Sequence, residues 1–297
     1  MKILISGSSG LIGRELSKRL VEDGHQVIPL IRPESRMQEG TVLWDPDAGL
    51  LDLSGAGDIN AVVHLAGENI AARRWSPAQK KRIRVSRVKG TQLLARAVAS
   101  LPDPPEVLVC GSAIGFYGDR GDEILDENSD PGSGFLAGVC REWEDACEPA
   151  VDGSIRTVHL RTGVVLAREG GALDRMLTLF RLGLGGRLGN GHQYMSWITL
   201  GDEIAAICHI LNSSNLSGPV NLVSPHPVTN AEFTRTLAKT VRRPAILPAP
   251  AFALRLALGE MADALLLSST RVVPKKLCDT GFEFRNKELG EALAALV

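Results

Sequence analysis

The sequence begins with MKILISGSSGLIG (residues 1–13), in which a β-favouring apolar run leads into a glycine-rich turn. Gly7, Gly10 and Gly13 are spaced as GxxGxxG, directly before a helical pattern. A tight turn needs a residue that accepts positive φ, and a pyrophosphate can approach the backbone at a helix N-terminus only where no Cβ intervenes. An ordinary tight turn is the alternative interpretation. We predict a dinucleotide-binding turn made of Gly7, Ser9, Gly10, Leu11, Ile12 and Gly13.

The first half of the chain alternates strand and helix patterns. After the turn, Ile12, Leu16 and Leu20 recur every four positions, which is typical of a helix, and a long helix is expected at about residues 76–100. Further strands are expected at residues 26–31, 41–44, 61–65, 107–110 and 157–160. Strands separated by helices predict parallel pairing with right-handed crossovers. The expected fold class is therefore α/β, with a Rossmann-type doubly wound parallel sheet.

The second half has a less regular pattern. Residues 170–191 are rich in glycine, and RLGLGGRLGNG (181–191) is typical of a flexible lid or binding loop. Helices are expected at residues 201–212, 230–241, 251–266 and 286–296. We expect a nucleotide-binding domain over residues 1–165, with a return segment at about 196–212. A smaller, interleaved α+β domain over residues 166–297 would then bind the substrate.

The end of the second strand bears on the choice between NAD and NADP. An NAD site usually places an acidic residue about 20 residues after the turn, where it accepts a hydrogen bond from the ribose 2′-OH. Here Arg32 stands at the strand end, with Arg36 nearby, and Glu34 is the first acid after the strand. A guanidinium can bind a 2′-phosphate bidentately. We predict NADP in preference to NAD; a solvated surface arginine is the alternative.

Composition narrows the class of protein. The chain has 297 residues, 44% of them hydrophobic and 23% charged, as in an ordinary soluble globular protein. Its net charge of −1 creates no global field that would attract nucleic acid or a membrane, and no apolar run reaches the ~18 residues of a membrane helix. Five scattered cysteines predict neither a disulfide framework nor a zinc site. We expect a cytoplasmic protein without a membrane partner.

With these residues in place, the chain resembles the extended short-chain dehydrogenase/reductase superfamily over nearly its whole length. ISGSSGLIG (5–13) is similar to the family's glycine turn, HLAG (64–67) to the segment beside the adenosine, and VKGTQLL (88–94) to a helix motif. The resemblance implies cofactor contacts from Leu65, Ala66 and Gly67. It also places Ser112, after the fifth strand, where the family keeps its catalytic serine. Ser112 would bind the substrate or the nicotinamide amide.

A narrower resemblance is to a branch often labelled an NADP-dependent nucleoside-diphosphate-sugar epimerase. It rests on GENIAARRW (67–75), RLGLGG (181–186), GNGHQYMSWI (189–198) and a segment that opens VPKKL (273–277). These strings are long and unusual, so they specify the branch. The substrate that the branch acts on is not established, and the resemblance leaves a homodimer open.

The chain departs from the superfamily at the catalytic helix. The family uses Tyr-x-x-x-Lys, whereas the corresponding segment reads GFLAGVCREWED (134–145) and offers Phe135 with Val139 or Leu136 with Cys140. None of these side chains supplies the phenol or the amine, so the usual proton transfer is absent. Tyr117 is a candidate replacement, provided that a nearby cation lowers its pKa. A tyrosine packed in the turn is the alternative.

The basic residues between positions 73 and 89, and Arg161, each have a functional and a structural interpretation. Eight of them lie between residues 73 and 89, which suggests either a nucleic-acid patch or a solvated helix face; the lack of interleaved aromatic residues favours the latter. The resemblance places Arg87 beside the cofactor, and Arg161, at the end of the sixth strand, is a second candidate for a phosphate or ribose contact.

Three residues that follow the glycine-rich loop are candidate substrate contacts: His192, Gln193 and Trp197. The loop could close over a substrate or serve as a simple connection. The favoured function is an NADP-binding oxidoreductase or epimerase acting on a small polar substrate, which the resemblance suggests to be a sugar nucleotide. A non-catalytic, NADP-responsive binding protein is the second hypothesis, and an RNA-binding protein is the third.

Overall fold

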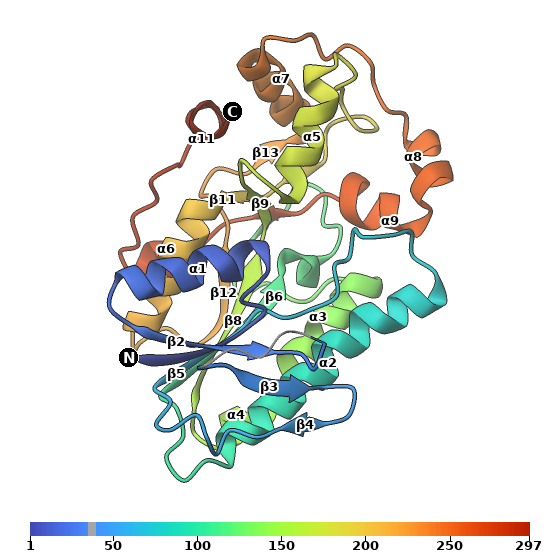
Figure 1. Cartoon of the computed structure of the whole chain (residues 1–297). Coiled ribbons are helices and arrows are strands. Elements are labelled where there is room, and N and C mark those ends of the chain that lie inside the picture. The colour runs from blue at the N-terminus through green and yellow to red at the C-terminus, as the bar shows by residue number, and fades with distance from the viewer. Residues whose placement is uncertain (35–39) are drawn as a thin grey trace.

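The computed structural model describes residues 1–34 and 40–297, which fold around one large sheet with helices on both faces (Figure 1). In this part of the chain the sheet has eight strands, in the order β12-β8-β6-β5-β1-β2-β3-β4. All neighbours are parallel except β3 and β4. The strands are β1 Lys2–Ser6, β2 Gln26–Ile31, β3 Val42–Asp45, β4 Leu50–Leu51, β5 Ala61–His64, β6 Val107–Ala113, β8 Arg156–Thr162 and β12 Gly218–Leu222.

The strand order reverses beside β1. The chain runs from β1 to β2 and β3 in one direction, then returns to β5 on the other side of β1 and continues through β6, β8 and β12. In open α/β sheets, ligands bind outside the carboxyl ends of the strands at such a switch point. The predicted doubly wound parallel sheet is therefore confirmed, and its switch point lies next to the glycine turn.

Alternation along β1 divides the core between the two faces of the sheet. Ile3 and Ile5 join the core under α1 and α6, whereas Leu4 faces the core under α2 and α4. Figure 1 shows α1 and α6 together on one side and α2, α3 and α4 on the other. These helices are α1 Leu11–Glu22, α2 Pro77–Ala99, α3 Phe135–Asp145, α4 Glu148–Asp152 and α6 Leu200–Asn212.

The remaining elements form a second lobe over the carboxyl ends of the strands. A separate apolar core joins α5, α7 and α11 with the short strands β9 and β11. Its elements include β9 Val164–Leu166, α5 Gly171–Arg181, β10 Tyr194–Met195, β11 Trp197–Thr199, β13 Val228–Thr229, α7 Asn230–Val241, α8 Ala251–Leu258, α9 Glu260–Ala262, η2 Asp263–Leu267 and α11 Leu289–Leu296. Nearer the sheet lie η1 Ile114–Tyr117, β7 Ile124–Leu125, β14 Arg271–Val272 and α10 Lys275–Asp279. Among the described residues, no helix has both the length and the apolarity to cross a bilayer.

The larger errors of secondary-structure prediction lie in the second half, although the short strands β4 and β7 of the first half were not predicted either. One helix over 251–266 is wrong, because Gly259 has a φ of 63° and separates α8 from α9. Helix α5 lies in the glycine-rich segment and was not predicted; its N-cap Gly170 and its first residue Gly171 both have positive φ. Strand β12 was also missed, since it opens on Gly-Pro, a pair typical of turns. The last helix begins at Leu289 rather than at residue 286.

Candidate cofactor site and the adjoining polar network

The turn between β1 and α1 has no room for side chains at two of its three glycines. Gly7 has a φ of 72°, and a Cβ there would stand 2.8 Å from the backbone nitrogen of Ala66. At Gly13 a Cβ would stand 2.2 Å from the carbonyl oxygen of Gly7, and at Gly10 it would stand 3.2 Å from the same oxygen. The turn thus brings β1, β5 and α1 into direct backbone contact, which is the geometry that the glycine spacing predicts.

The N-terminus of α1 is open to an anion. Its N-cap is Gly10, so no side chain caps it, and its first turn carries no acidic residue. Ser9 and Gly10 are exposed at the tip of the turn. On its other side the turn meets the segment after β5, where the nitrogen of Leu65 donates to the carbonyl oxygen of Ser6 at 3.2 Å and that of Ala66 to Ser6 Oγ at 3.3 Å. Free helical N–H groups and the helix dipole favour a phosphate here.

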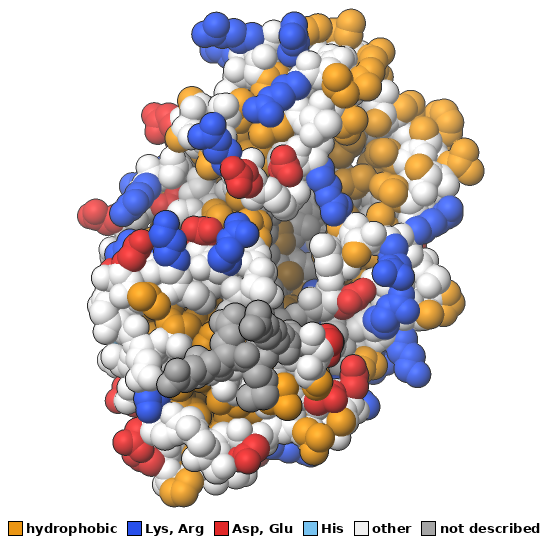
Figure 2. Space-filling view, viewed as in Figure 1, with side chains coloured by type: hydrophobic (Ala, Val, Ile, Leu, Met, Phe, Trp, Pro, Cys, Tyr) orange, Lys and Arg blue, Asp and Glu red, His pale blue; other side chains and the backbone are white. Residues whose placement is uncertain are grey.

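The second lobe reaches the same turn. A Cβ at Gly171 would stand 3.1 Å from Leu11 Cδ2, so the start of α5 packs against the first residue of α1. Figure 2 shows a deep hollow in this face of the molecule, between the sheet-bearing part and the second lobe. The hollow and the turn together form the candidate cofactor site.

Arg32 directly follows β2 and is half-buried. Because β2 is the neighbour of β1, this position lies at the carboxyl edge of the sheet beside the turn. Arg36, the second basic residue considered for a 2′-phosphate, lies outside the described residues.

Arg87 lies beneath the loop that follows β5. A Cβ at Gly67 would stand 3.4 Å from Arg87 Cζ, and Arg87 Nη1 donates to the carbonyl oxygens of Glu68 and Ile83, each at 3.1 Å. Its guanidinium also lies over the Trp143 ring, 4.8 Å from the centroid. The structure thus brings Arg87 next to Gly67, another residue of the predicted cofactor site.

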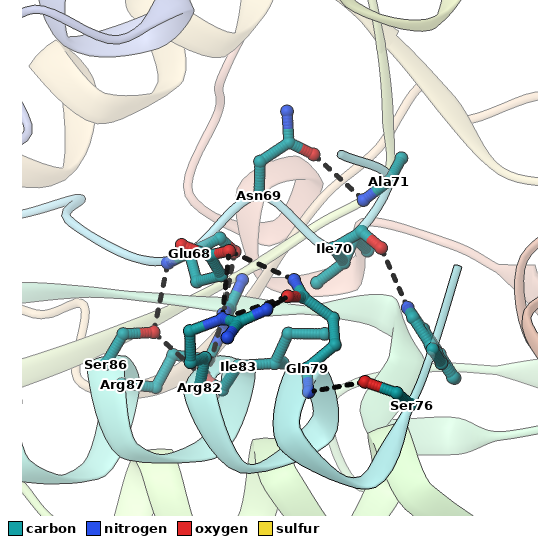
Figure 3. Close-up of polar contacts among 11 residues, drawn as sticks. Glu68, Asn69, Ile70, Ala71, Ser76, Gln79, Arg82, Ile83, Ser86 and Arg87 are labelled. Carbon is teal, nitrogen blue, oxygen red and sulfur yellow. Dashed lines mark hydrogen bonds and ion pairs between the residues drawn. The ribbon is translucent and has the colours of Figure 1, made fainter. Parts of the chain in front are cut away.

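Glu68 ties the same loop to α2 (Figure 3). Its Oε1 accepts from Gln79 Nε2 at 3.0 Å and lies 3.9 Å from Arg82 Nε, and its backbone nitrogen donates to Ser86 Oγ at 3.0 Å. Elsewhere on the basic helix, Lys80 pairs with Glu260 at 2.8 Å and Arg84 pairs with Glu142. Three of the eight basic residues in this run therefore have an acidic partner within the molecule, which weakens the argument for a nucleic-acid patch.

A row of polar side chains crosses three strands near their carboxyl ends. Ser112 of β6 is in register with Arg161 of β8, which is in register with Asn221 of β12. Ser112 Oγ donates to Glu144 Oε1 at 2.7 Å, and Arg161 binds both oxygens of that carboxylate, at 2.9 and 2.8 Å. Only 5% of the Arg161 side chain and 11% of the Glu144 side chain are exposed. This is a nearly buried, bidentate ion pair with Ser112 attached to it.

Every nitrogen of the Arg161 guanidinium has a partner within the protein. Its remaining terminal nitrogen, Nη1, donates to Tyr117 Oη at 3.0 Å, and its Cζ lies 3.4 Å from the centroid of the Phe116 ring. Glu144, an acid on α3, directs the guanidinium inward, and the contact between Arg161 and cofactor phosphate or ribose stays a prediction.

Tyr117 is wholly buried in the same network. Its hydroxyl donates to Asn221 Oδ1 at 2.7 Å while accepting from Arg161. Burial raises the pKa of Tyr117 to about 12, although the neighbouring Arg161 cation acts to lower it. The cation that an acid/base tyrosine would require is present, but desolvation outweighs it. These surroundings favour the packed tyrosine, and the acid/base role of Tyr117 stays a prediction.

Of the two candidate residue pairs on α3, the structure shows which one faces the segment after Ser112. A Cβ at Gly115 would stand 3.3 Å from Leu136 Cβ and 3.8 Å from Cys140 Sγ. Leu136 and Cys140, one turn apart on α3, thus face the segment that follows Ser112. Burial raises the pKa of the Cys140 thiol to about 12. Neither residue can exchange a proton near neutral pH.

The three candidate substrate residues differ in exposure. Trp197 is fully buried in the second core and its Nε1 donates to the carbonyl oxygen of His226 at 3.1 Å, which contradicts a substrate contact. Gln193 is buried, and its Nε2 donates to the carbonyl oxygens of Leu188 and Leu266. Of the three, only His192 is exposed.

Glu144 is the site residue that sequence reasoning missed. It lies two turns after Leu136 on α3, among other charged residues of the stretch REWED, so nothing in the sequence marks it as buried. One feature of the sequence could have indicated its role. An acid on the buried face of a helix that packs on a sheet needs a basic partner, and Arg161 is the cation at the end of a buried strand.

Comparison with known proteins places the chain among epimerase-like proteins. The model of the NAD dependent epimerase/dehydratase family matches residues 3–223, and a model described as a domain of unknown function matches residues 249–296. The chain is 46% identical to an epimerase family protein of Mycobacterium bovis, covering 98% of this chain and 96% of that protein. It is 37% identical to the human epimerase family protein SDR39U1 over the full length of both.

Solved structures agree with these matches. The crystal structure of human SDR39U1 with NADPH superposes with a TM-score of 0.91 at 35% identity, covering 100% of this chain and 99% of that one. UDP-glucose 4-epimerase of Thermotoga maritima, solved with UDP-glucose, gives a TM-score of 0.77 at 17% identity, covering 99% of this chain and 96% of that one. The second likeness shows a shared fold only.

Proposed function

Because the chain belongs to the NAD dependent epimerase/dehydratase family, we propose that it binds NADP(H) and transfers hydride to or from a small polar substrate. Sugar nucleotides are the first substrate class to test. The observation that carries the proposal is the uncapped N-terminus of α1, which lies behind a turn in which Gly7 and Gly13 leave no space for a Cβ. The human relative crystallised with NADPH supports the choice of cofactor.

The residues around the turn fit such a cofactor. The free N–H groups of α1 would hold the pyrophosphate, and the segment from Leu65 to Gly67 would lie along the adenosine side. Arg32 would hold the 2′-phosphate. Arg87, fixed through Nη1 to two carbonyl oxygens, would turn its other N–H groups toward the ribose.

Ser112 and Glu144 are the best candidates for handling the proton. When bound, the nicotinamide supplies or accepts the hydride. The Ser112 hydroxyl donates a hydrogen bond to Glu144. The serine oxygen therefore keeps lone pairs that can accept a hydrogen bond from a substrate hydroxyl. A proton taken up by Ser112 would pass to the Glu144 carboxylate. Arg161 fixes that carboxylate in place as a positioning residue.

The second lobe, which lies within residues 166–297 but leaves out α6 and β12 of the sheet-bearing part, is the proposed substrate side. It closes on the glycine turn through α5, and exposed His192 lies in its glycine-rich loop. A second candidate function follows from α3: with Leu136 and Cys140 at the catalytic position and Tyr117 buried, the protein would bind NADP(H) and respond to it without turnover.

Gly13→Ala is expected to weaken NADPH binding by ~100-fold. The added methyl would meet the Gly7 carbonyl oxygen, and the shifted turn would lose about two hydrogen bonds to the pyrophosphate at roughly 1.5 kcal/mol each. Isothermal titration with NADPH measures the effect. Gly201→Ala is the matched control, because a Cβ at that helical glycine meets nothing within 4 Å. Unchanged affinity in Gly13→Ala would refute the proposed site.

Arg32→Ala is expected to reduce the preference for NADPH over NADH by about tenfold or more, because a charge-assisted contact to the 2′-phosphate is worth roughly 1.5–3 kcal/mol. The affinity for NADH should change little. Fluorescence titrations with both cofactors test this, with exposed Arg96→Ala on α2 as the control. Tighter binding of NADH than of NADPH by the unmodified protein would contradict the assignment of Arg32 to the 2′-phosphate.

Ser112→Ala is expected to lower turnover by about 100-fold, in the range that a general acid or base contributes, while NADPH affinity stays within a few-fold. NADPH oxidation is followed across a panel of nucleotide sugars and carbonyl compounds. Tyr117→Phe serves as the comparison and should lose little activity, since its hydroxyl is buried. Tight NADPH binding without turnover on any member of the panel would favour the binding-protein function instead.

A further inference from the structure

Two segments of the second lobe contain only basic charges. Residues 175–191 and 233–259 hold eight lysines and arginines and no aspartate or glutamate, in a chain whose net charge is −1. The small net charge of the whole chain therefore conceals a local excess of positive charge in these two segments. Seven of these cations are exposed and, within the described residues, are in no ion pair: Arg175, Arg181, Arg187, Arg235, Lys239, Arg242 and Arg243.

The same two segments expose an unusual amount of apolar surface. They carry seven of the thirteen large hydrophobic side chains that are exposed in the described residues. These are Leu179, Leu182, Leu184, Ile246, Leu247, Phe252 and Leu256. Helix α8 buries none of its residues, and Phe252 and Leu256 on it are 72% and 79% exposed. Burial in a core thus does not explain why α8 is apolar.

The two segments form one surface. The backbone nitrogen of Ala249 donates to the carbonyl oxygen of Arg187 at 2.9 Å, and that of Gly189 donates to the carbonyl oxygen of Ala249 at 2.9 Å. A cavity of about 440 Å³ opens between them, with Arg187, Arg235 and Ile246 in its wall. Figure 2 shows hydrophobic side chains gathered at this end of the molecule, with basic ones beside them. We call these two exposed sets of residues the basic-apolar surface.

We propose that the basic-apolar surface docks on an anionic lipid bilayer. Apolar side chains rimmed by arginines suit the interface of a membrane, where the former enter the acyl boundary and the latter meet lipid phosphates. A second copy of the chain is a poor occupant, because two surfaces of the same positive charge would repel each other. A nucleic acid is also a poor fit, since Phe252 is the one aromatic residue of the set that could stack on a base.

The docking would be peripheral, with the cavity between Arg187 and Arg235 available to a lipid phosphate. It does not depend on the cofactor proposal, because none of the surface residues belongs to the glycine turn or the Ser112 network. The expectation of no membrane partner rested on the net charge of the whole chain and on the lack of an apolar run long enough to cross a membrane. The local excess of positive charge on the second lobe is the reason to propose a membrane partner.

Co-sedimentation of the full chain with vesicles tests the proposal. We expect binding to vesicles of phosphatidylcholine with phosphatidylglycerol, weak binding to phosphatidylcholine alone, and loss of binding at high salt. Arg242→Gln with Arg243→Gln should weaken binding by roughly 30-fold, since each cation near an anionic surface contributes about 1 kcal/mol. Phe252→Ser with Leu256→Ser should weaken it by roughly 100-fold, as expected for two side chains that leave the bilayer.

Matched controls lie on other parts of the molecule. Leu50→Ser with Val151→Ser removes two exposed apolar side chains, and Lys18→Gln with Arg96→Gln removes two exposed cations; both pairs should bind as the unmodified protein does. Equal binding to neutral and anionic vesicles, or unchanged binding of the Phe252 and Leu256 variant, would overturn the proposal. So would light scattering that shows a dimer lost in that variant, together with no vesicle binding.

Discussion

Arg161→Met is expected to destabilise the protein by about 3–5 kcal/mol, the usual cost of removing one partner of a buried ion pair. The substitution leaves Glu144 with 11% of its side chain exposed and without its bidentate donor. It also removes the donor to Tyr117 Oη and the cation over the Phe116 ring. Urea unfolding followed by circular dichroism measures the free energy of unfolding.

A double variant separates charge from packing in this experiment. Arg161→Met combined with Glu144→Gln removes both charges, while the amide oxygen still accepts from Ser112 Oγ. It should therefore regain about 2 kcal/mol relative to the single variant. If Arg161→Met costs less than about 1 kcal/mol, the pair is not the buried interaction described above.

Glu203→Gln is expected to stabilise the protein by roughly 4 kcal/mol at pH 8. Glu203 is fully buried on α6, and burial raises its pKa from 4.5 to about 8. Between these two values the folded protein retains a proton that the unfolded chain releases, so the free energy of unfolding falls as the pH rises. Glutamine carries no ionisable proton and can still accept the hydrogen bond from Thr162 Oγ1, which is 2.9 Å long.

Unfolding at a series of pH values tests this expectation. The difference between Glu203→Gln and the unmodified protein should be small near pH 4 and should grow with pH up to about 8. Glu283→Gln is the control, because Glu283 is exposed. A stability difference that does not change between pH 5 and pH 8 would show that Glu203 is ionised in the folded protein.

The cofactor turn could be predicted from the sequence because its determinants are local. Three glycines at fixed spacing, a preceding apolar strand and a following helical stripe all lie within residues 1–20. The structure adds the reason that Gly7 and Gly13 cannot be replaced: both face backbone atoms at under 3 Å. Strand and helix patterns in the first half were likewise readable, because each element has a strong period of its own.

The polar network could not be predicted in the same way. Ser112, Glu144, Arg161 and Asn221 come from four elements, and their meeting depends on strand register and on the packing of α3. Because the sequence does not reveal the pairing with Glu144, Arg161 is interpreted from the sequence as a cation that contacts the cofactor. Without the burial of Tyr117, its phenol looked available for proton transfer.

The sequence by itself determined the class of fold, the glycine turn and the absence of Tyr-x-x-x-Lys, since each of these is written in adjacent residues. Only the tertiary structure decided which charges are buried in pairs and which face the solvent. It placed Arg161 against Glu144 and left seven cations of the basic-apolar surface without an ion pair among the described residues. The physical reason is that the behaviour of a charge depends on its solvation and its partner, and both are set by residues that are distant in the chain.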